Sequence, residues 1–238
     1  MQQIMSAFPP RALESLAYSS GGLSLAPMSF RHAGAMDPRD AVLKRTADII
    51  LALCGLILMG IPMLLAALAI RMDSQGPALF RQERIGLNGR RFVMLKFRTM
   101  HDAPAAPNTC PQAIRHDPRV TPIGAFLRRT SFDEFPQLLN VLAGSMSLVG
   151  PRPHAPGTCA GGRPFEAVSH RYAARHCVKP GMTGLAQIRG WRGETDTEEK
   201  LLRRIDSDLE YIAIWSLGRD LMILCRTIVT VLRMPNAY

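Results

Sequence analysis

The chain has 238 residues, a formal net charge of +10 and a sequence pI near 10.0. This length allows one domain with a good core, or one domain and a membrane anchor. The positive charge predicts polyanionic partners, and beside the apolar segment described below it favours lipid headgroups and phosphorylated substrates over nucleic acid. The five cysteines are scattered without a C-x-x-C pair, which argues against a disulfide framework and a zinc site.

The chain begins with a segment, residues 1–36, that is rich in Ser, Gly, Ala and Pro. This composition predicts a flexible leader, and the absence of a basic region followed by an apolar one argues against a cleavable signal peptide. Asp37 and Pro38 then predict a helix start, with Asp37 as the cap and Pro38 in the first position.

Residues 49–70 carry no charge and organise the rest of the chain. At about 1.5 Å per residue, a straight helix of this length would just cross a hydrocarbon core of about 30 Å. Pro62 interrupts the segment, and basic residues, among them Lys44, Arg45 and Arg71, flank both of its ends. The positive-inside rule places such flanks on the cytoplasmic side. We therefore expect residues 37–72 to form a re-entrant helix-break-helix anchor; a tilted single span and a buried core helix stay open.

After the anchor, residues 78–85 and 91–98 flank the pair Asn88-Gly89, a strong signal for a β-hairpin. Alternation along the second strand puts Lys96 and Arg98 on the same face. On spacing alone, these are two solvated charges on an exposed sheet face.

The rest of the chain predicts mainly helices. Helical patterns cover residues 120–129, a segment capped by Asp133 that ends at Gly144, and a charged stretch at 198–215. A final amphipathic helix at 217–232 is suited to the membrane interface, whereas residues 178–184 predict a constrained loop. The expected fold is mainly α with a small β-hairpin: a re-entrant membrane anchor followed by a domain, residues 73–238, that ends in interfacial helices.

Asp133 and Glu134 stand together just after Arg128-Arg129, so two carboxylates lie beside two cations. One carboxylate can attack phosphorus as a covalent nucleophile while its neighbour holds Mg²⁺. The simpler alternative is that both residues only cap a helix.

Several long motifs in a fixed order resemble the bacterial sugar transferases, the monotopic polyprenyl-phosphate hexose-1-phosphate transferases. The resemblance covers residues 41–233 and rests on residues 44–45, 95–100, 117–120, 127–138, 148–154 and 179–187.

The resemblance implies that Asp133 attacks the sugar-bearing phosphate of a UDP-sugar and releases UMP. Undecaprenyl phosphate then takes the phosphosugar from the enzyme, which is the first membrane step of exopolysaccharide biosynthesis. Glu134 would bind Mg²⁺. The remaining site residues would bind phosphate or nucleotide; they are Lys96, Arg98, Arg128, Arg152 and Pro153. The expected location is the bacterial inner membrane, with the catalytic domain on the cytoplasmic face among membrane lipids; a homo-oligomer stays open.

Two features of the resemblance leave alternatives. The family usually has Ser-Pro at the break, whereas this chain has Ile61-Pro62. Residues 190–197 look like those of glucose-1-phosphate transferases, with galactose-1-phosphate as the alternative sugar. The rival from another class is a non-catalytic, membrane-tethered anion-binding protein.

Overall fold

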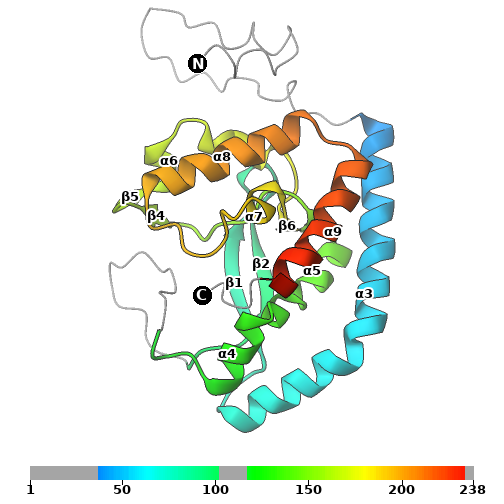
Figure 1. The fold of residues 1–238 in the computed structure, drawn as a ribbon, viewed down its shortest axis with the longest axis vertical. Helices are drawn as coiled ribbons and strands as arrows, with labels where there is room; N and C mark the ends of the chain where they lie inside the picture. Colours follow the sequence, from blue (N-terminus) through cyan, green and yellow to red (C-terminus); the bar gives the residue numbers. More distant parts are fainter. Residues whose placement is uncertain (1–36, 102–116, 234–238) are drawn as a thin grey trace, which may run out of the picture.

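The computed structural model describes residues 37–101 and 117–233, so the leader expected at 1–36 lies outside the described residues. This part of the chain is mainly helical, as expected, with three two-stranded sheets (Figure 1). The longer helices are α3 (Pro38–Asp73), α4 (Pro122–Arg129), α5 (Gln137–Ala143), α8 (Glu198–Ala213) and α9 (Leu217–Arg233). The strands are β1 (Leu79–Ile85), β2 (Arg91–Phe97), β3 (Ser147–Val149), β4 (Cys159–Ala160), β5 (Arg163–Pro164) and β6 (Gly181–Thr183). The short helical turns are η2 (Leu87–Gly89), η3 (Phe132–Glu134), α6 (Phe165–Val168), η4 (Tyr172–Cys177) and α7 (Leu185–Ile188).

Helix α3 begins as predicted, because the Asp37 carboxylate accepts the backbone N–H of Arg39 at 2.8 Å and Pro38 follows it. The expected break at Pro62 is wrong: the helix continues through this residue and bends instead (Figure 1). One missing N–H removes one hydrogen bond, which kinks a helix without ending it. Of the described residues, α3 is the one helix long and apolar enough to cross a membrane.

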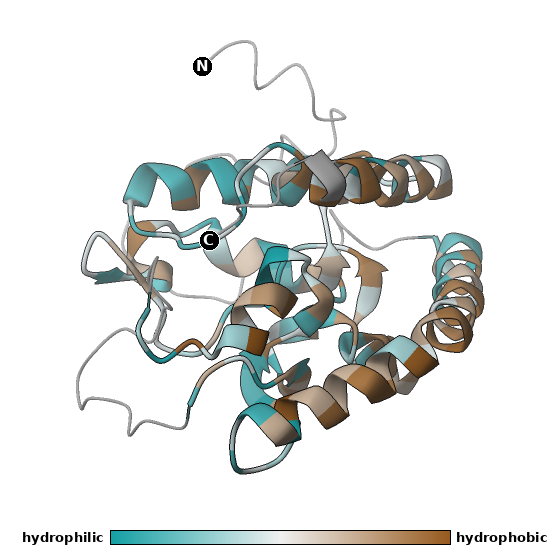
Figure 2. Ribbon diagram, turned by 60° about the horizontal axis from the view of Figure 1, so that its bottom comes forward, coloured by the Kyte–Doolittle hydropathy of each residue, from teal (hydrophilic) through white to brown (hydrophobic). Residues whose placement is uncertain are grey.

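The bend lets both arms of α3 pack on the same body. In the first arm Ala52 is fully buried, and a Cβ added to Gly55 would lie 3.2 Å from Leu138 on α5, so the two helices are in close contact. In the second arm Ile70 is buried with Phe97 of β2 and Leu127 of α4. Between these contacts, most of the α3 ribbon has the colour of hydrophobic residues (Figure 2), and many of these residues are exposed. The exposed ones include Ile50, Leu53, Ile57, Leu58, Ile61, Leu64, Leu65 and Leu68.

Polar contacts hold the first turns of α3 to the body. Arg45 donates to the carbonyls of Val141 and Leu142 at 2.6 and 2.8 Å, which satisfies the free end of α5. Asp48 is buried and accepts the Ser147 hydroxyl and the Leu148 N–H. The basic residues before the apolar segment therefore have a structural role in addition to their charge.

The hairpin of β1 and β2 is confirmed, with Leu79 opposite Phe97 and Ile85 opposite Arg91. Asn88 adopts a φ of 53°, which Asn tolerates better than most residues. Both faces of β2 are covered, because Met94 lies in the main core and Phe97 in the cluster with Ile70. The interpretation of Lys96 as a solvated charge is therefore wrong, since its side chain is only 16% exposed.

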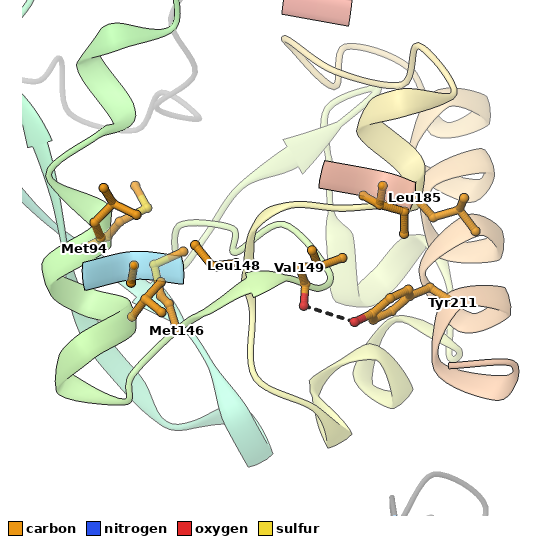
Figure 3. Packing of buried hydrophobic residues seen from close by; sticks show 10 residues of the cluster. Met94, Met146, Leu148, Val149, Leu185 and Tyr211 are labelled. Carbon is orange, nitrogen blue, oxygen red and sulfur yellow. Dashed lines mark hydrogen bonds between the residues drawn. The ribbon is translucent and has the colours of Figure 1, made fainter. Parts of the chain in front are cut away.

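Strands β3 and β6 form a parallel pair that the sequence did not predict, with Ser147 opposite Gly181 and Val149 opposite Thr183. Residues 178–184 thus pack partly against β3. A Cβ on Gly181 would lie 2.1 Å from the nitrogen of Gly150, so the close approach requires glycine. Met94, Met146, Leu148, Val149, Leu185 and Tyr211 pack in the main core around this pair (Figure 3).

The two C-terminal helices confirm the predicted elements at 198–215 and 217–232. Tyr211 of α8 donates its hydroxyl to the carbonyl of Val149 at 3.1 Å (Figure 3) and to Asp220 of α9 at 2.8 Å. Helix α9 exposes Leu221, Met222, Ile228 and Val229, and its interfacial position stays a prediction. Among the described cysteines, Cys54, Cys177 and Cys225 are free.

Candidate functional site

The predicted acidic pair lies in the turn η3, just before α5. The prediction that Asp133 caps α5 is wrong, because α5 begins only at Gln137 and no side chain caps it. Ser131 takes a left-handed φ of 56°, and the chain then makes a tight turn in which Phe135 N–H bonds to Phe132 O. Pro136 has no N–H, and the N–H groups of Leu138 and Leu139 bond to the carbonyls of Phe135 and Pro136. The two carboxylates are therefore left for other partners.

Glu134 is held by two cations from other parts of the fold. Lys96 on β2 places its Nζ 2.7 Å from Oε1 of Glu134. Arg152, which follows β3, donates Nη2 to the same oxygen and Nη1 to Oε2 at 3.2 Å. Asp133 is less tightly paired, with Oδ2 4.0 Å from the Lys96 Nζ. We call these four residues the Asp133 cluster.

The environment separates the pKa values of the two carboxylates. Burial raises the pKa of Asp133 to about 6; the charge of Glu134 adds to this, while Lys96, Arg128 and Arg152 oppose it. Burial acts in the same direction on Glu134, but Arg152 and Lys96 outweigh it and hold the pKa of this carboxyl well below its usual range. Glu134 is thus a fixed anion, whereas Asp133 is ionised near neutral pH and pairs with Lys96 over a longer distance, 4.0 Å.

The structure brings together four of the predicted site residues and places the others nearby or apart. Arg128 lies near enough to Asp133 for its positive charge to lower the pKa of that carboxyl. Pro153 lines a small surface pocket that it shares with Arg152. Arg98 is engaged elsewhere: it donates to the Ser74 carbonyl at 2.7 Å and to the Ser74 hydroxyl at 3.0 Å. These bonds close the turn after α3, and the predicted phosphate contact of Arg98 stays untested.

Sequence reasoning missed the residues that hold Arg152 in place. Arg175 donates Nη2 to the carbonyl of Arg152 at 2.7 Å and pairs with Asp208 of α8 at 2.6 Å, with both side chains buried. Its Nη1 lies 2.9 Å from His154 Nδ1. Burial, followed by the charge of Arg175, lowers the pKa of His154 well below its usual range, so the neutral ring accepts this bond. The pattern around Arg175 carried no signal for a pairing with a distant helix.

The Asp133 cluster offers two carboxylates as possible ligands for Mg²⁺. Within residues 37–101 and 117–233, no group of three or more His, Cys, Asp or Glu side chains is arranged to hold a metal ion. Mg²⁺ is usually bound by one or two carboxylates and by oxygens of the substrate phosphates. Asp133 and Glu134 fit this pattern for an ion that arrives with a diphosphate.

A buried carboxylate with a raised pKa thus lies among the charges of Lys96, Arg128 and Arg152, on a described body with one long apolar helix. Such an arrangement suits an enzyme that acts on phosphorylated substrates. Residues 39–234 match the model of the bacterial sugar transferases, and the chain belongs to this family. The resemblance noted from the motifs is thereby confirmed.

Several curated relatives are similar over most of this chain. The UDP-glucose:undecaprenyl-phosphate glucose-1-phosphate transferase of Caulobacter vibrioides is 50% identical over 91% of this chain and 80% of its own length. The undecaprenyl-phosphate glucose phosphotransferase of Komagataeibacter xylinus is 48% identical over 84% of this chain, but over 37% of its own length. The exopolysaccharide production protein PSS of Rhizobium leguminosarum bv. phaseoli is 48% identical over 84% of this chain and 100% of its length.

Proposed function

We propose that the protein transfers glucose-1-phosphate from UDP-glucose to undecaprenyl phosphate and releases UMP, as the first membrane step of exopolysaccharide biosynthesis. The observation that carries this proposal is the contrast within the Asp133 cluster. Glu134 is ion-paired with Lys96 and Arg152, whereas Asp133 is buried with a pKa of about 6 and lies farther from the Lys96 Nζ, at 4.0 Å. The names of the relatives, all at about half identity, support the substrates.

In the first step, an Oδ atom of Asp133 attacks the phosphorus that bears the sugar. A bond forms between this oxygen and phosphorus, and the bond to the bridging oxygen of the diphosphate breaks, with UMP leaving on the electron pair. In the second step, an oxygen of undecaprenyl phosphate attacks the same phosphorus, and Asp133 leaves as a carboxylate. Lys96, Arg128 and Arg152 neutralise the phosphate charge, which supplies most of the catalysis in phosphoryl transfer.

Glu134 and Asp133 would hold Mg²⁺ together with the substrate, and the ion would supply further charge neutralisation on the diphosphate. Because Glu134 is already fixed by two cations, its oxygens are oriented before the substrate enters. This ordering lowers the cost of binding.

We further propose that α3 is a re-entrant anchor at the cytoplasmic face of the bacterial inner membrane. Both arms pack on the catalytic body, the first through Ala52 and the second through Ile70, so the two ends of the apolar segment belong to one side. A tilted single span would separate them. Cysteine labelling from each side of the membrane at Thr46 and Met72, exposed residues on either side of the apolar segment, distinguishes the two arrangements. Labelling of both from the same side supports the re-entrant anchor.

A non-catalytic anion-binding protein accounts for the cations but gives no reason to bury Asp133 among them. The experiment that tests the proposal measures UMP release from UDP-glucose with undecaprenyl phosphate present, for the wild type and for Asp133→Asn. We expect at least about a 1,000-fold loss in the variant, which is typical when a covalent nucleophile is removed. Retained turnover would contradict the proposal. UDP-galactose in the same assay decides between the two sugars.

A further inference from the structure

The outer edge of β2 is closed by a side chain rather than by a strand. Among the described residues β2 pairs only with β1, which leaves its other edge open. Asn140 of α5 fills two positions on this edge, because its Nδ2 donates to the Val93 carbonyl at 2.7 Å and its Oδ1 accepts the Leu95 N–H at 2.9 Å. The carboxamide therefore bonds to β2 as the backbone of a neighbouring strand would.

These two bonds connect the elements that bear the two halves of the Asp133 cluster. Lys96 directly follows Leu95 on β2, and α5 directly follows the turn that carries Asp133 and Glu134. A shift of β2 along α5 would move the Lys96 Nζ away from its 2.7 Å contact with Glu134. A shift by one residue would turn the Lys96 side chain to the opposite face of the strand.

Asn140 is itself held rigidly. It is 6% exposed, and its own carbonyl accepts the N–H groups of Ser145 and Met146 at 3.1 and 3.3 Å where the chain turns after Gly144. An N–H donor on one side and a carbonyl on the other also decide the orientation of the amide. An ionised Asp side chain has no donor and Leu has neither a donor nor an acceptor, so neither can replace both bonds.

We propose that Asn140 is a positioning residue for phosphoglycosyl transfer, which fixes the register of β2 against α5 and thereby places the Lys96 ammonium between Glu134 and Asp133. The inference rests on the proposed function, because its effect on rate acts through Lys96. Asn140 does not itself touch the substrate or the reacting atoms in this account.

The test is a double-mutant cycle between Asn140→Leu and Lys96→Met, measured as kcat/KM for UDP-glucose. Asn140→Leu alone should lower kcat/KM by ~10- to 100-fold, since small misplacements of catalytic groups have effects of this size. In the Lys96→Met background the same change should cost less than about threefold, because the residue through which it acts is gone. Asn140→Asp, which keeps the acceptor for Leu95 but loses the donor to Val93, serves as a second variant of nearly identical size.

Gln187→Leu is the matched control. It removes a carboxamide that donates to the Met182 carbonyl at 2.9 Å in another part of the fold, so its effect should simply add to that of Lys96→Met. Additive effects of Asn140 and Lys96, or full activity in both Asn140 variants, would overturn the proposal.

A second readout needs no substrate. Hydrogen exchange of the β2 amides, Leu95 above all, should be at least tenfold faster in Asn140→Leu and unchanged in Gln187→Leu. Unchanged hydrogen exchange at Leu95 in Asn140→Leu would overturn the positioning role of Asn140, even if no activity on UDP-glucose can be measured. If exchange is faster but turnover does not depend on Asp133, Asn140 does fix the strand and the proposed function is wrong instead.

Discussion

Lys44 on α3 and Asp220 on α9 form a buried ion pair, with 2.6 Å between Nζ and Oδ2 and side-chain exposures of 12% and 6%. Asp220 also accepts the Tyr211 hydroxyl at 2.8 Å and the Trp215 indole N–H at 3.0 Å. The first arm of the apolar helix is thus joined to the end of the catalytic body by one satisfied polar network.

Breaking this pair should destabilise the protein. Asp220→Ala leaves the Lys44 ammonium buried without its counter-ion, which typically costs about 3–5 kcal/mol. Thermal unfolding in detergent should show a clear loss of stability. Asp206→Ala, which removes an exposed partner of Arg171, is the control and should change stability by less than about 1 kcal/mol. Equal effects of the two changes would contradict the structural role of the pair.

The rate should depend on the ionisation of Asp133. Its carboxylate is the attacking form, so kcat should rise with pH through a pKa of about 6 and level off above it. The groups that face Asp133 are Glu134, Lys96, Arg128 and Arg152, and the last three lower its pKa. In Lys96→Met the acid limb of the residual activity should therefore move to higher pH. A limb that stays in place would show that Lys96 does not act on Asp133.

Ionisation of Asp133 should raise the rate but lower the stability of the fold. The pKa of Asp133 is higher in the folded protein than its ordinary 3.8, so the ionised group destabilises the fold above about pH 6. Asp133→Asn should be more stable than the wild type at pH 8, by up to about 3 kcal/mol. The gain should disappear as pH falls from about 6 to 4. Unfolding midpoints of both proteins at pH 4.5 and 8 measure this, and a pH-independent difference would refute it.

The network behind Arg152 should be needed for activity. Arg175→Met removes the donor to the Arg152 carbonyl and leaves Asp208 buried without its partner. We expect kcat/KM to fall ~10- to 100-fold through the misplaced Arg152. Arg171→Met, which breaks an exposed pair nearby, serves as the comparison and should keep nearly full activity. Comparable losses in both variants would count against the positioning of Arg152.

Local patterns predicted the elements whose signals lie within a few residues. Asn88-Gly89 predicted the hairpin, and the helical period predicted α8 and α9. The interior of the fold carried no such signal, because β3 and β6 are three residues long and pair across a long loop. The ion pair of Arg175 and Asp208 also gave no local signal, because the two residues are far apart in the sequence. At Pro62, proline was rightly expected to disturb the helix, but the helix bends there and does not break. The helix start predicted at Asp133 is a tight turn, because α5 begins only at Gln137.

The sequence predicted the charged residues of the site but not the residues that hold them in place. Asp133, Glu134, Lys96 and Arg152 were identified, and the structure brings them together. Arg98 shares a strand pattern with Lys96, yet its guanidinium bonds to Ser74, since the period of a strand does not say where a long side chain ends. The local pattern did not single out Asn140, because its partners lie on a distant strand.

The most direct test of the covalent mechanism is a single-turnover experiment without the lipid acceptor. Purified enzyme is mixed with UDP-glucose that carries label in its β-phosphate, quenched, and examined by mass spectrometry of its peptides. We predict UMP release in proportion to enzyme and a phosphosugar on Asp133, both absent in Asp133→Asn. UMP that forms only after undecaprenyl phosphate is added, with no label on the protein, would show direct transfer and contradict the mechanism.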